Sequence, residues 1–377
     1  MIPSLRHSFN QSYTPEKYSR FLGLMEQRTG LPARFRLSET PVFLARELVD
    51  KLARYGRELV DSLLSNKTYL QTSDHSIPPQ FKVRNEDPYP LFVQADFGLD
   101  QDLEPKLVEI QGFPSLYAFQ PVLASSYADA YDIDLPSNPE YAGILREAIL
   151  AGHDPREVIL LEIDPTNQKT YADFLLTEKL CGIQTVDIRD LKKDGNRLSY
   201  GNGIPVRRIY NRAIVDELTR REIPLAFDWR DDLDVEWAGH PNWFFRLSKF
   251  SLPFFDHVCV PETHFVDEIG SVEDPENWVL KPLFSFAGLG VVVSPTRDQI
   301  EDARGRDFIL QRKVDFRPVI ETPYGKTKIE IRMMYIWRNG GLEFVNTIIR
   351  SGRGTQMGVD FNKGLDWVGA SAAFLAG

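Results

Sequence analysis

The sequence predicts a mixed α/β protein with more than one domain. A chain of 377 residues is long enough to bury two or three hydrophobic cores. An apolar run at 158–163 is followed by a helical pattern at 171–181 and a second strand pattern at 184–188. Strand, helix and strand in that order predict a small parallel sheet. Elsewhere, strand patterns are separated by short turns, which predicts antiparallel pairing as well.

Composition and charge narrow the class of protein. The net charge of −10 argues against a general nucleic-acid or anionic-membrane binder. Cys181 and Cys259 lie far apart, which gives neither a disulfide framework nor a zinc site and indicates a reducing compartment. The first residues lack the apolar core of a signal peptide, and no apolar run reaches membrane-spanning length. We therefore expect a cytoplasmic protein that binds neither nucleic acid nor membrane, and the sequence leaves its oligomeric state open.

The first 90 residues are dominated by helical patterns. Thr14 and Gly30 suit the two ends of a helix over 14–30, with Pro15 at its first position. A longer helix is expected over 41–65, because its leucines recur on one broad stripe. Both are interpreted as packing helices that carry no chemistry.

A β-hairpin with acidic residues follows. Its strands are expected at 91–97 and 106–110, and Asp96 lies on the first. Glu109 and Gln111, two positions apart on the second strand, share a face. Oxygen-bearing side chains on one face can hold Mg²⁺, with phosphates and waters completing its coordination. The alternative, a solvated outer face, suits Glu109 less well because apolar residues flank it.

The middle of the chain contains helices at 116–131 and 138–152 around the predicted parallel sheet. That sheet lacks the glycine fingerprint of a dinucleotide site. A further strand at 206–210 lies near clustered arginines, which recognise carboxylates or phosphates or are ordinary surface charge: Arg207, Arg208 and Arg212.

A lysine and a glycine-containing loop follow at 278–294. Lys281 ends a strand, and a second β-branched run begins at Val291. Between them a hydroxyl and two glycines lie at a hairpin tip, where backbone N–H groups can approach an anion closely: Ser285, Gly288 and Gly290. The loop is not a Walker A motif, and most such hairpins are only turns. The prediction of a phosphate site here therefore depends on the order of the sequence features on both sides of the loop.

The last third of the chain is rich in strands. A helix and a strand at 257–260 are expected after Lys249, and another strand is expected at 308–314. Residues 328–337 alternate, so Lys328, Glu330 and Arg332 form an ionic row on one face. Asn339 and Gly340 predict a two-residue hairpin, and its return strand ends at Arg350. The polar, glycine-rich loop at 351–364 is a candidate lid.

This order of features resembles an ATP-grasp domain over residues 242–364. In that family one lysine begins the domain, a second precedes a glycine hairpin, and an acid-Ile-Arg strand and a strand ending in arginine follow. The family's usual Glu-x-Asn metal motif is missing after Gly364, but Glu109-Ile110-Gln111, with Asp96 upstream, looks like it. That order is similar to circularly permuted ATP-grasp proteins such as the glutathionylspermidine synthase-like carboxylate-amine ligases.

The resemblance implies an ATP-grasp fold with a small parallel α/β (pre-ATP-grasp) domain and an N-terminal helical segment. It divides the chain into that segment, a permuted metal-binding hairpin and helix, the pre-ATP-grasp-like domain and the nucleotide-binding region, at residues 1–90, 91–132, 133–241 and 242–377.

The resemblance also implies ATP and Mg²⁺ as cofactors, and small-molecule carboxylate and amine substrates joined through an acyl phosphate. Phosphates would be bound by Lys249, Lys281, Ser285, Gly288 and Gly290. Gln311 would meet the adenine amine, with the backbone of Lys313 and Val314 at the ring edge. Mg²⁺ would be held by Asp96, Glu109 and Gln111. Arg350, with Arg332, would stabilise the transferring phosphoryl group.

Two departures leave alternatives open. Gln111 replaces the family's asparagine, and Gln94 replaces an arginine that in the ligases handles the reacting phosphoryl group. One rival is an ATP-grasp phosphotransferase, and another is a nucleotide-binding module that has lost catalysis. A structural protein without a ligand is disfavoured by the ordered lysine, glycine and arginine series.

Overall fold

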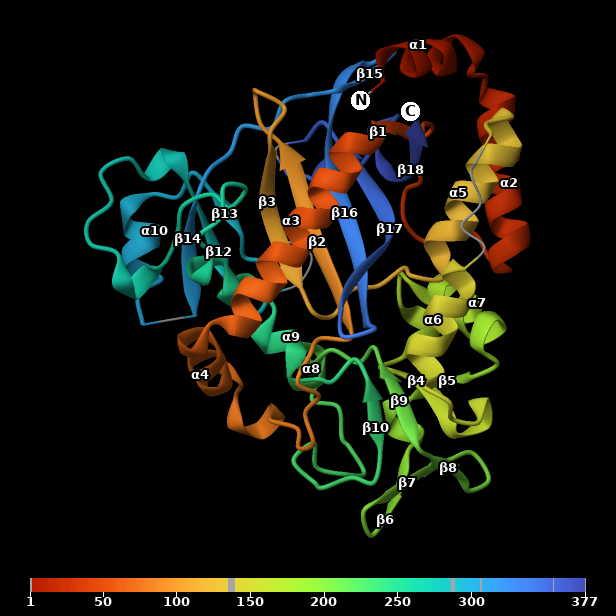
Figure 1. Ribbon diagram of the computed structural model, residues 1–377, viewed down its shortest axis with the longest axis vertical. Helices are drawn as coiled ribbons and strands as arrows, with labels where there is room; N and C mark the ends of the chain where they lie inside the picture. The colour runs from red at the N-terminus through yellow and green to blue at the C-terminus, as the bar shows by residue number, and fades with distance from the viewer. Residues whose placement is uncertain (1, 135–139, 286–288, 306, 355, 377) are drawn as a thin grey trace.

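The structure is a computed structural model that describes residues 2–134, 140–285, 289–305, 307–354 and 356–376 (Figure 1). Gly288, one of the predicted phosphate-binding glycines, lies outside the described residues. Within them, no helix combines the length and apolar character needed to cross a membrane.

A seven-stranded sheet forms the centre of the fold, with β15 paired to β16 beside the main order β1-β18-β17-β16-β2-β3. Its pairs are antiparallel except β1 with β18. The strands come from widely separated parts of the chain: β1 (Val42–Ala45), β2 (Phe92–Leu99), β3 (Pro105–Gln111), β15 (Ile320–Thr322), β16 (Gly325–Arg338), β17 (Gly341–Gly352) and β18 (Gly369–Ala376).

The predicted hairpins are confirmed. β2 and β3 pair antiparallel, with a register shift directly after Asp96. β16 and β17 are joined at Asn339 and Gly340, whose φ angles of 53° and 78° are those of a two-residue turn that follows the twist of the strands.

Helices cover both faces of this sheet. α3 (Arg46–Ser65) packs on one face, and α2 (Pro15–Thr29) and α5 (Phe119–Tyr131) pack on the other (Figure 1). α1 (Pro3–Ser12) and α4 (Lys67–Ser76) flank them. The predicted caps of α2 are confirmed, since the Thr14 side chain accepts from Lys17 N and Gly30 is left-handed at φ 83°.

The helix predicted over 41–65 was wrong at its start, because residues 42–45 form β1. Val42 and Leu44 point into the core under α3, whereas Phe43 points into the core on the α5 side. Alternation between two cores is the pattern of a strand, and it was hidden because the segment runs directly into a true helix.

The predicted parallel sheet is also confirmed, in the order β10-β9-β4-β5. The predicted strand at 206–210 is in fact two strands that separate at Arg207. The elements of this region are α6 (Tyr141–Leu150), β4 (Val158–Glu162), α7 (Tyr171–Cys181), β5 (Gln184–Asp187), β6 (Lys192–Asp194), β7 (Arg197–Tyr200), β8 (Ile204–Val206), β9 (Arg208–Asn211), α8 (Val215–Arg220) and β10 (Glu236–Ala238).

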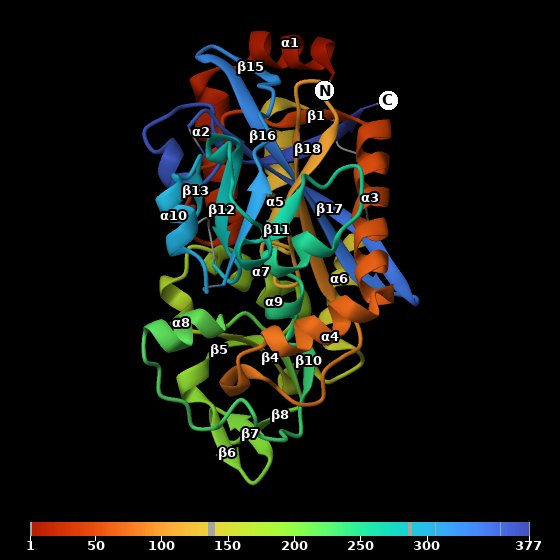
Figure 2. The same ribbon diagram turned by 90° about the vertical axis from the view of Figure 1, so that its left-hand side faces the viewer.

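A third sheet, in the order β11-β14-β12-β13, packs beside the β2–β3 hairpin (Figures 1 and 2). The strand predicted at 257–260 was wrong, because the chain turns there and the Cys259 carbonyl accepts from Leu107 N at 2.7 Å. The elements here are α9 (Trp243–Arg246), a 3-10 helix (Lys249–Phe254), β11 (Thr263–Phe265), β12 (Trp278–Pro282), β13 (Val292–Val293), α10 (Arg297–Asp302) and β14 (Phe308–Arg312).

Candidate functional site

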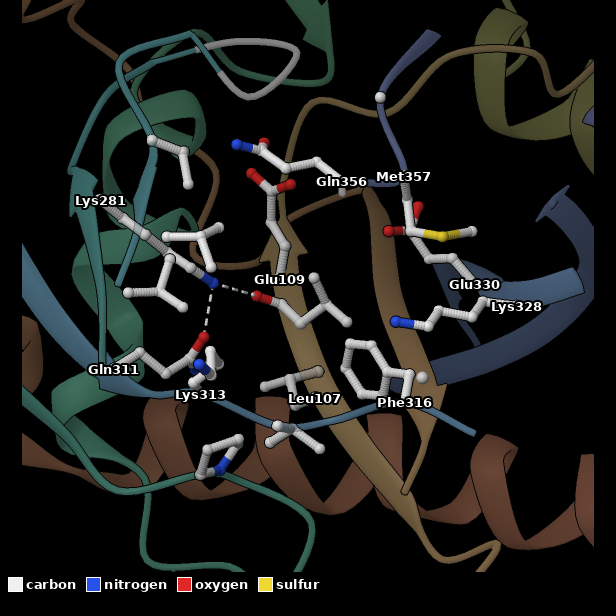
Figure 3. Close-up of a pocket in the computed structure, with 18 of the residues that line it drawn as sticks. Leu107, Glu109, Lys281, Gln311, Lys313, Phe316, Lys328, Glu330, Gln356 and Met357 are labelled. Carbon is white, nitrogen blue, oxygen red and sulfur yellow. Dashed lines mark hydrogen bonds between the residues drawn. The ribbon is translucent and has the colours of Figure 1, made fainter. Parts of the chain in front are cut away.

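A cavity of about 250 Å³ lies between the third sheet and the central sheet (Figure 3). One side is apolar, with Val279 and Val293 from the third sheet and Leu107 from the β2–β3 hairpin. Phe316 lies against Gly98 of β2, where a Cβ atom would come 2.3 Å from its ring. The glycine therefore lets this aromatic ring pack directly on the strand and line the cavity.

Two lysines far from the hairpin in sequence meet it at this cavity. Lys281 Nζ donates to Val108 O at 3.1 Å and to Gln311 Oε1, as Figure 3 shows. Lys249 Nζ donates to Ser285 O at 2.8 Å and lies 3.1 Å from Glu109 Oε1. The structure thus brings together both predicted phosphate-binding lysines and one predicted metal ligand.

An ionic row crosses the central sheet next to the lysines. Asp96 pairs across the strands with Glu109 on one side and Arg332 on the other, and Glu330 pairs with Arg350. Arg332 Nη2 lies 3.2 Å from Asp96 Oδ2 and 2.7 Å from Glu330 Oε1, and Arg350 Nη1 lies 3.3 Å from that same oxygen. The predicted row on β16 therefore extends over β2, β3 and β17.

The charges in this row shift one another's pKa values. Burial raises the pKa of the Asp96 carboxyl to about 7, against the opposing effect of Arg332. Burial also acts to raise the pKa of Glu109, but Lys249, Lys281 and Arg332 outweigh it and hold that pKa below its ordinary value. Burial lowers the pKa of Lys281 to about 8. At neutral pH the site therefore keeps a charged Lys281 beside a charged Glu109.

Of the three predicted metal ligands only Glu109 lines the cavity, so a Mg²⁺ ion there would need further oxygen ligands from water or a bound molecule. No group of three or more His, Cys, Asp or Glu side chains in the described residues is arranged to hold a metal on its own. Asp96 is already held by Gln94 Nε2, 2.7 Å from Oδ1, and by Arg332. Glu109 lines the cavity, and Mg²⁺ is commonly bound by one or two carboxylates plus phosphate oxygens. The roles of Asp96 and Gln111 as further ligands stay predictions.

Of the remaining predicted residues, two line the cavity and two do not. Lys313 and Val314 line the cavity, although Lys313 N already donates to Asn277 O at 2.8 Å. The Ser285 hydroxyl is buried without a hydrogen-bond partner in the described residues, and Gly290 has φ 74°.

Sequence reasoning identified one wall segment as a loop but did not single out its residues, and it missed Phe316. Gln356, Met357 and Gly358 line the cavity from the loop that was predicted as a candidate lid. Nothing in the sequence distinguishes Phe316 from other aromatic residues, and its place depends on a contact with Gly98 more than 200 residues away.

The clustered arginines lie outside this cavity's wall. Arg207 pairs with Asp234 at 3.0 Å, and Arg208 with Glu236 at 3.0 Å. Arg212 lies over the Phe113 ring and donates to Pro114 O. These arginines therefore make structural contacts in and around the parallel-sheet region.

The fold is mixed α/β, and the cavity lies between two of its sheets. Among solved structures, the chain is similar to a glutathione synthetase-like effector from Globodera pallida in its apo form. The TM-score is 0.61 over 97% of this chain and 98% of that chain, at 14% sequence identity. At that identity the likeness establishes the fold alone. No protein-family model and no curated protein sequence matches the chain.

Proposed function

We propose that this protein is an ATP- and Mg²⁺-dependent ligase that joins a carboxylate to an amine on a small or peptide-like molecule. The observation that carries the proposal is the contact between an early acidic hairpin and two lysines that the chain reaches much later. Glu109 meets Lys249 at 3.1 Å, and the Val108 carbonyl meets Lys281 at 3.1 Å, at one cavity. If the two segments met only to pack against each other, the buried lysines beside the apolar side of the cavity would have no purpose.

Two features of the cavity support a nucleoside triphosphate as its ligand. Its apolar side, with Val279, Val293 and Leu107, can enclose a base. Its charged side carries Lys249, Lys281, Lys328 and Arg350 against Glu109 and Glu330. The excess of cations there would be neutralised by phosphates.

The proposed chemistry depends on positioning and charge rather than on a nucleophilic side chain. A substrate carboxylate attacks the γ-phosphorus of ATP, which releases ADP and leaves an acyl phosphate. The amine then attacks the acyl carbon, phosphate leaves, and the amine gives up a proton. Lys249 and Lys281 would hold the phosphates, and Arg350, steadied with Arg332 by Glu330, would stabilise the transferring phosphoryl group. Mg²⁺ beside Glu109 would offset phosphate charge.

Two other functions use the same cavity. An ATP-grasp phosphotransferase would give ADP and a stable phosphoester instead of an amide. A binding module without catalysis is favoured by Asp96, which Gln94 and Arg332 already hold. The similar fold belongs to a protein described as a glutathione synthetase-like effector, so peptide-like substrates belong in the first panel.

The test is nucleotide binding followed by product analysis. Lys281→Ala should weaken Mg²⁺·ATP binding by ~100-fold or more, because it removes a buried cation from the phosphate side. Glu109→Ala should retain nucleotide binding and lose Mg²⁺-dependent ADP release. Isothermal titration measures the first result, and ADP release over a panel of amino acids, polyamines and short peptides, with mass spectrometry, measures the second.

The control is Lys326→Ala, which removes an exposed lysine on the same strand as Glu330. It should bind nucleotide as the wild type does. Wild-type affinity in Lys281→Ala, or full turnover in Glu109→Ala, would overturn the proposal. ADP release with a phosphoester as product would support the phosphotransferase instead.

A further inference from the structure

The side-chain amide of Gln311 has a fixed orientation in the cavity. Gln311 is 3% exposed on β14, and its Oε1 accepts from Lys281 Nζ. An ammonium group has only donors, so the amide must turn its oxygen, and not its nitrogen, toward the lysine. Lys281 is held in turn by Val108 O at 3.1 Å, so both ends of this contact are anchored (Figure 3).

The other end of the amide is left without a partner. Gln311 Nε2 is buried and makes no hydrogen bond among the described residues. Buried amide donors are nearly always satisfied, and an unmet one costs free energy. Because Gln311 lines the cavity, an acceptor on a bound ligand is the partner that the position provides for.

We propose that Gln311 donates Nε2–H to acceptor atoms on the Hoogsteen edge of a purine and so determines base selectivity. Adenine presents the acceptor N7 beside a donor 6-amino group on that edge, whereas guanine and hypoxanthine present two acceptors, N7 and O6. The site therefore takes 6-oxopurine triphosphates at least as well as ATP. This inference rests on the proposed function, since it requires a purine nucleotide in the cavity.

The proposal reverses the role expected for Gln311 from the sequence. To meet the adenine amine, Gln311 would have to offer an acceptor, but its acceptor is engaged by Lys281. An amine placed against Nε2 would bring two donors face to face. The ring nitrogen N7 is then the atom of adenine that suits Gln311.

The test compares four triphosphates by isothermal titration with Mg²⁺ and the unmodified protein: ATP, ITP, 7-deaza-ATP and purine riboside triphosphate. 7-Deaza-ATP lacks the N7 acceptor and should bind roughly ten-fold more weakly than ATP. Purine riboside triphosphate lacks only the amine and should bind as tightly as ATP or more tightly. ITP should bind at least as tightly as ATP.

Two variants address the residue itself. Gln311→Glu keeps an acceptor toward Lys281 and turns a second acceptor toward the base, so ATP should be preferred over ITP by ~10-fold. Gln311→Met has neither group and should reduce the difference between ATP and 7-deaza-ATP. Thermal unfolding establishes that both variants fold, and the comparison of nucleotides on the wild type does not depend on them.

The outcomes separate this inference from the proposed function. Equal binding of ATP and 7-deaza-ATP, or a loss of affinity with purine riboside triphosphate, would overturn the role of Gln311 while nucleotide binding stands. Failure of all four triphosphates to bind would overturn both.

Discussion

Asp96 and Glu109 face each other across two strands, yet their environments move their pKa values in opposite directions. Asp96 is 1% exposed, and burial raises its pKa to about 7. Glu109 is next to Lys249 and Lys281, and their charges outweigh its burial. Side-chain identity and strand position are readable from the sequence, but burial depth and the nearest cation are not. The pair's titration is therefore a property of the packed structure.

The raised pKa of Asp96 predicts a pH-dependent stability. Between its ordinary pKa of 3.8 and about 7, the folded state keeps a proton that the unfolded state releases. The contribution of Asp96 to stability therefore falls as pH rises through this window. Asp96→Asn, which keeps the shape without the charge, should become more stable than the wild type by on the order of 2 kcal/mol at pH 7, with little difference near pH 4.

The measurement is urea unfolding of both proteins from pH 4 to pH 7.5. The groups that face Asp96 are the same in both proteins: Gln94, Glu109, Glu330, Arg332 and Arg350. Asp102→Asn, in the exposed turn of the same hairpin, is the control for removing a carboxylate from this hairpin and should be as stable as the wild type at pH 7. Parallel curves for Asp96→Asn and the wild type would contradict the prediction.

At the scale of elements, the Asn362 side chain makes four hydrogen bonds within the loop after β17. Asn362 Oδ1 accepts from Arg353 N and Gly354 N, and its Nδ2 donates to Gln356 O and Gly358 O, each at 2.9 Å. Gln356 and Gly358 line the cavity. These hydrogen bonds order the loop at the cavity wall, which would reduce the entropy lost when a ligand binds there.

Asn362→Ala should release this loop and weaken nucleotide binding by roughly ten-fold, since the cost of ordering it would return on binding. Hydrogen exchange over residues 352–362 should rise in the variant and fall again with Mg²⁺·ATP. Asn362→Asp keeps the acceptor and loses the donor, so it should lie between the two. Exchange equal to that of the wild type would mean that other contacts hold the loop.

The elements that sequence patterns predicted best have strong local signals. The caps of α2, the Asn339-Gly340 turn and the alternation in β16 each depend on residues a few positions apart. β1 and the turn at 257–260 were missed because their conformation is decided by distant partners. Val42 pairs with Ala373, and the Cys259 carbonyl pairs with Leu107 N. Contacts with partners so distant in the chain cannot be read from the pattern of neighbouring residues.

At the scale of the molecule, the order of motifs predicted which segments share the cavity but not how they meet. The lysines and the acidic hairpin were expected to share a nucleotide, whereas the Lys249–Glu109 and Lys281–Gln311 contacts depend on exact side-chain placement. That placement comes from the packing of the third sheet against the β2–β3 hairpin, which sequence periodicity does not contain. For the same reason, the reversed orientation of the Gln311 amide could not be predicted.

The N-terminal segment packs against the C-terminal segment through strand pairing and hydrogen bonds. β1 pairs parallel with β18, and α1, β1 and β18 lie together at one end of the molecule (Figures 1 and 2). Ser371 Oγ donates to Thr40 O at 2.6 Å, and Trp367 N to Glu39 Oε2 at 2.7 Å. The segment predicted as a helical unit therefore supplies an edge strand of the central sheet and covers both of its cores.

Removal of residues 2–45 should accordingly destabilise the whole molecule. It would expose one edge of β18 and the apolar residues under Phe43 and Leu44, a loss comparable to the ~5–15 kcal/mol of an entire domain. Leu44→Ala, at a fully buried position, should cost roughly 3 kcal/mol, whereas Leu22→Ala, at a position 38% exposed, should cost well under 1 kcal/mol. Thermal unfolding followed by tryptophan fluorescence and by nucleotide binding should give one shared transition in Leu44→Ala. A soluble truncated chain with wild-type melting temperature and nucleotide affinity would contradict this coupling, because it would mean that the cavity is built without the edge strand.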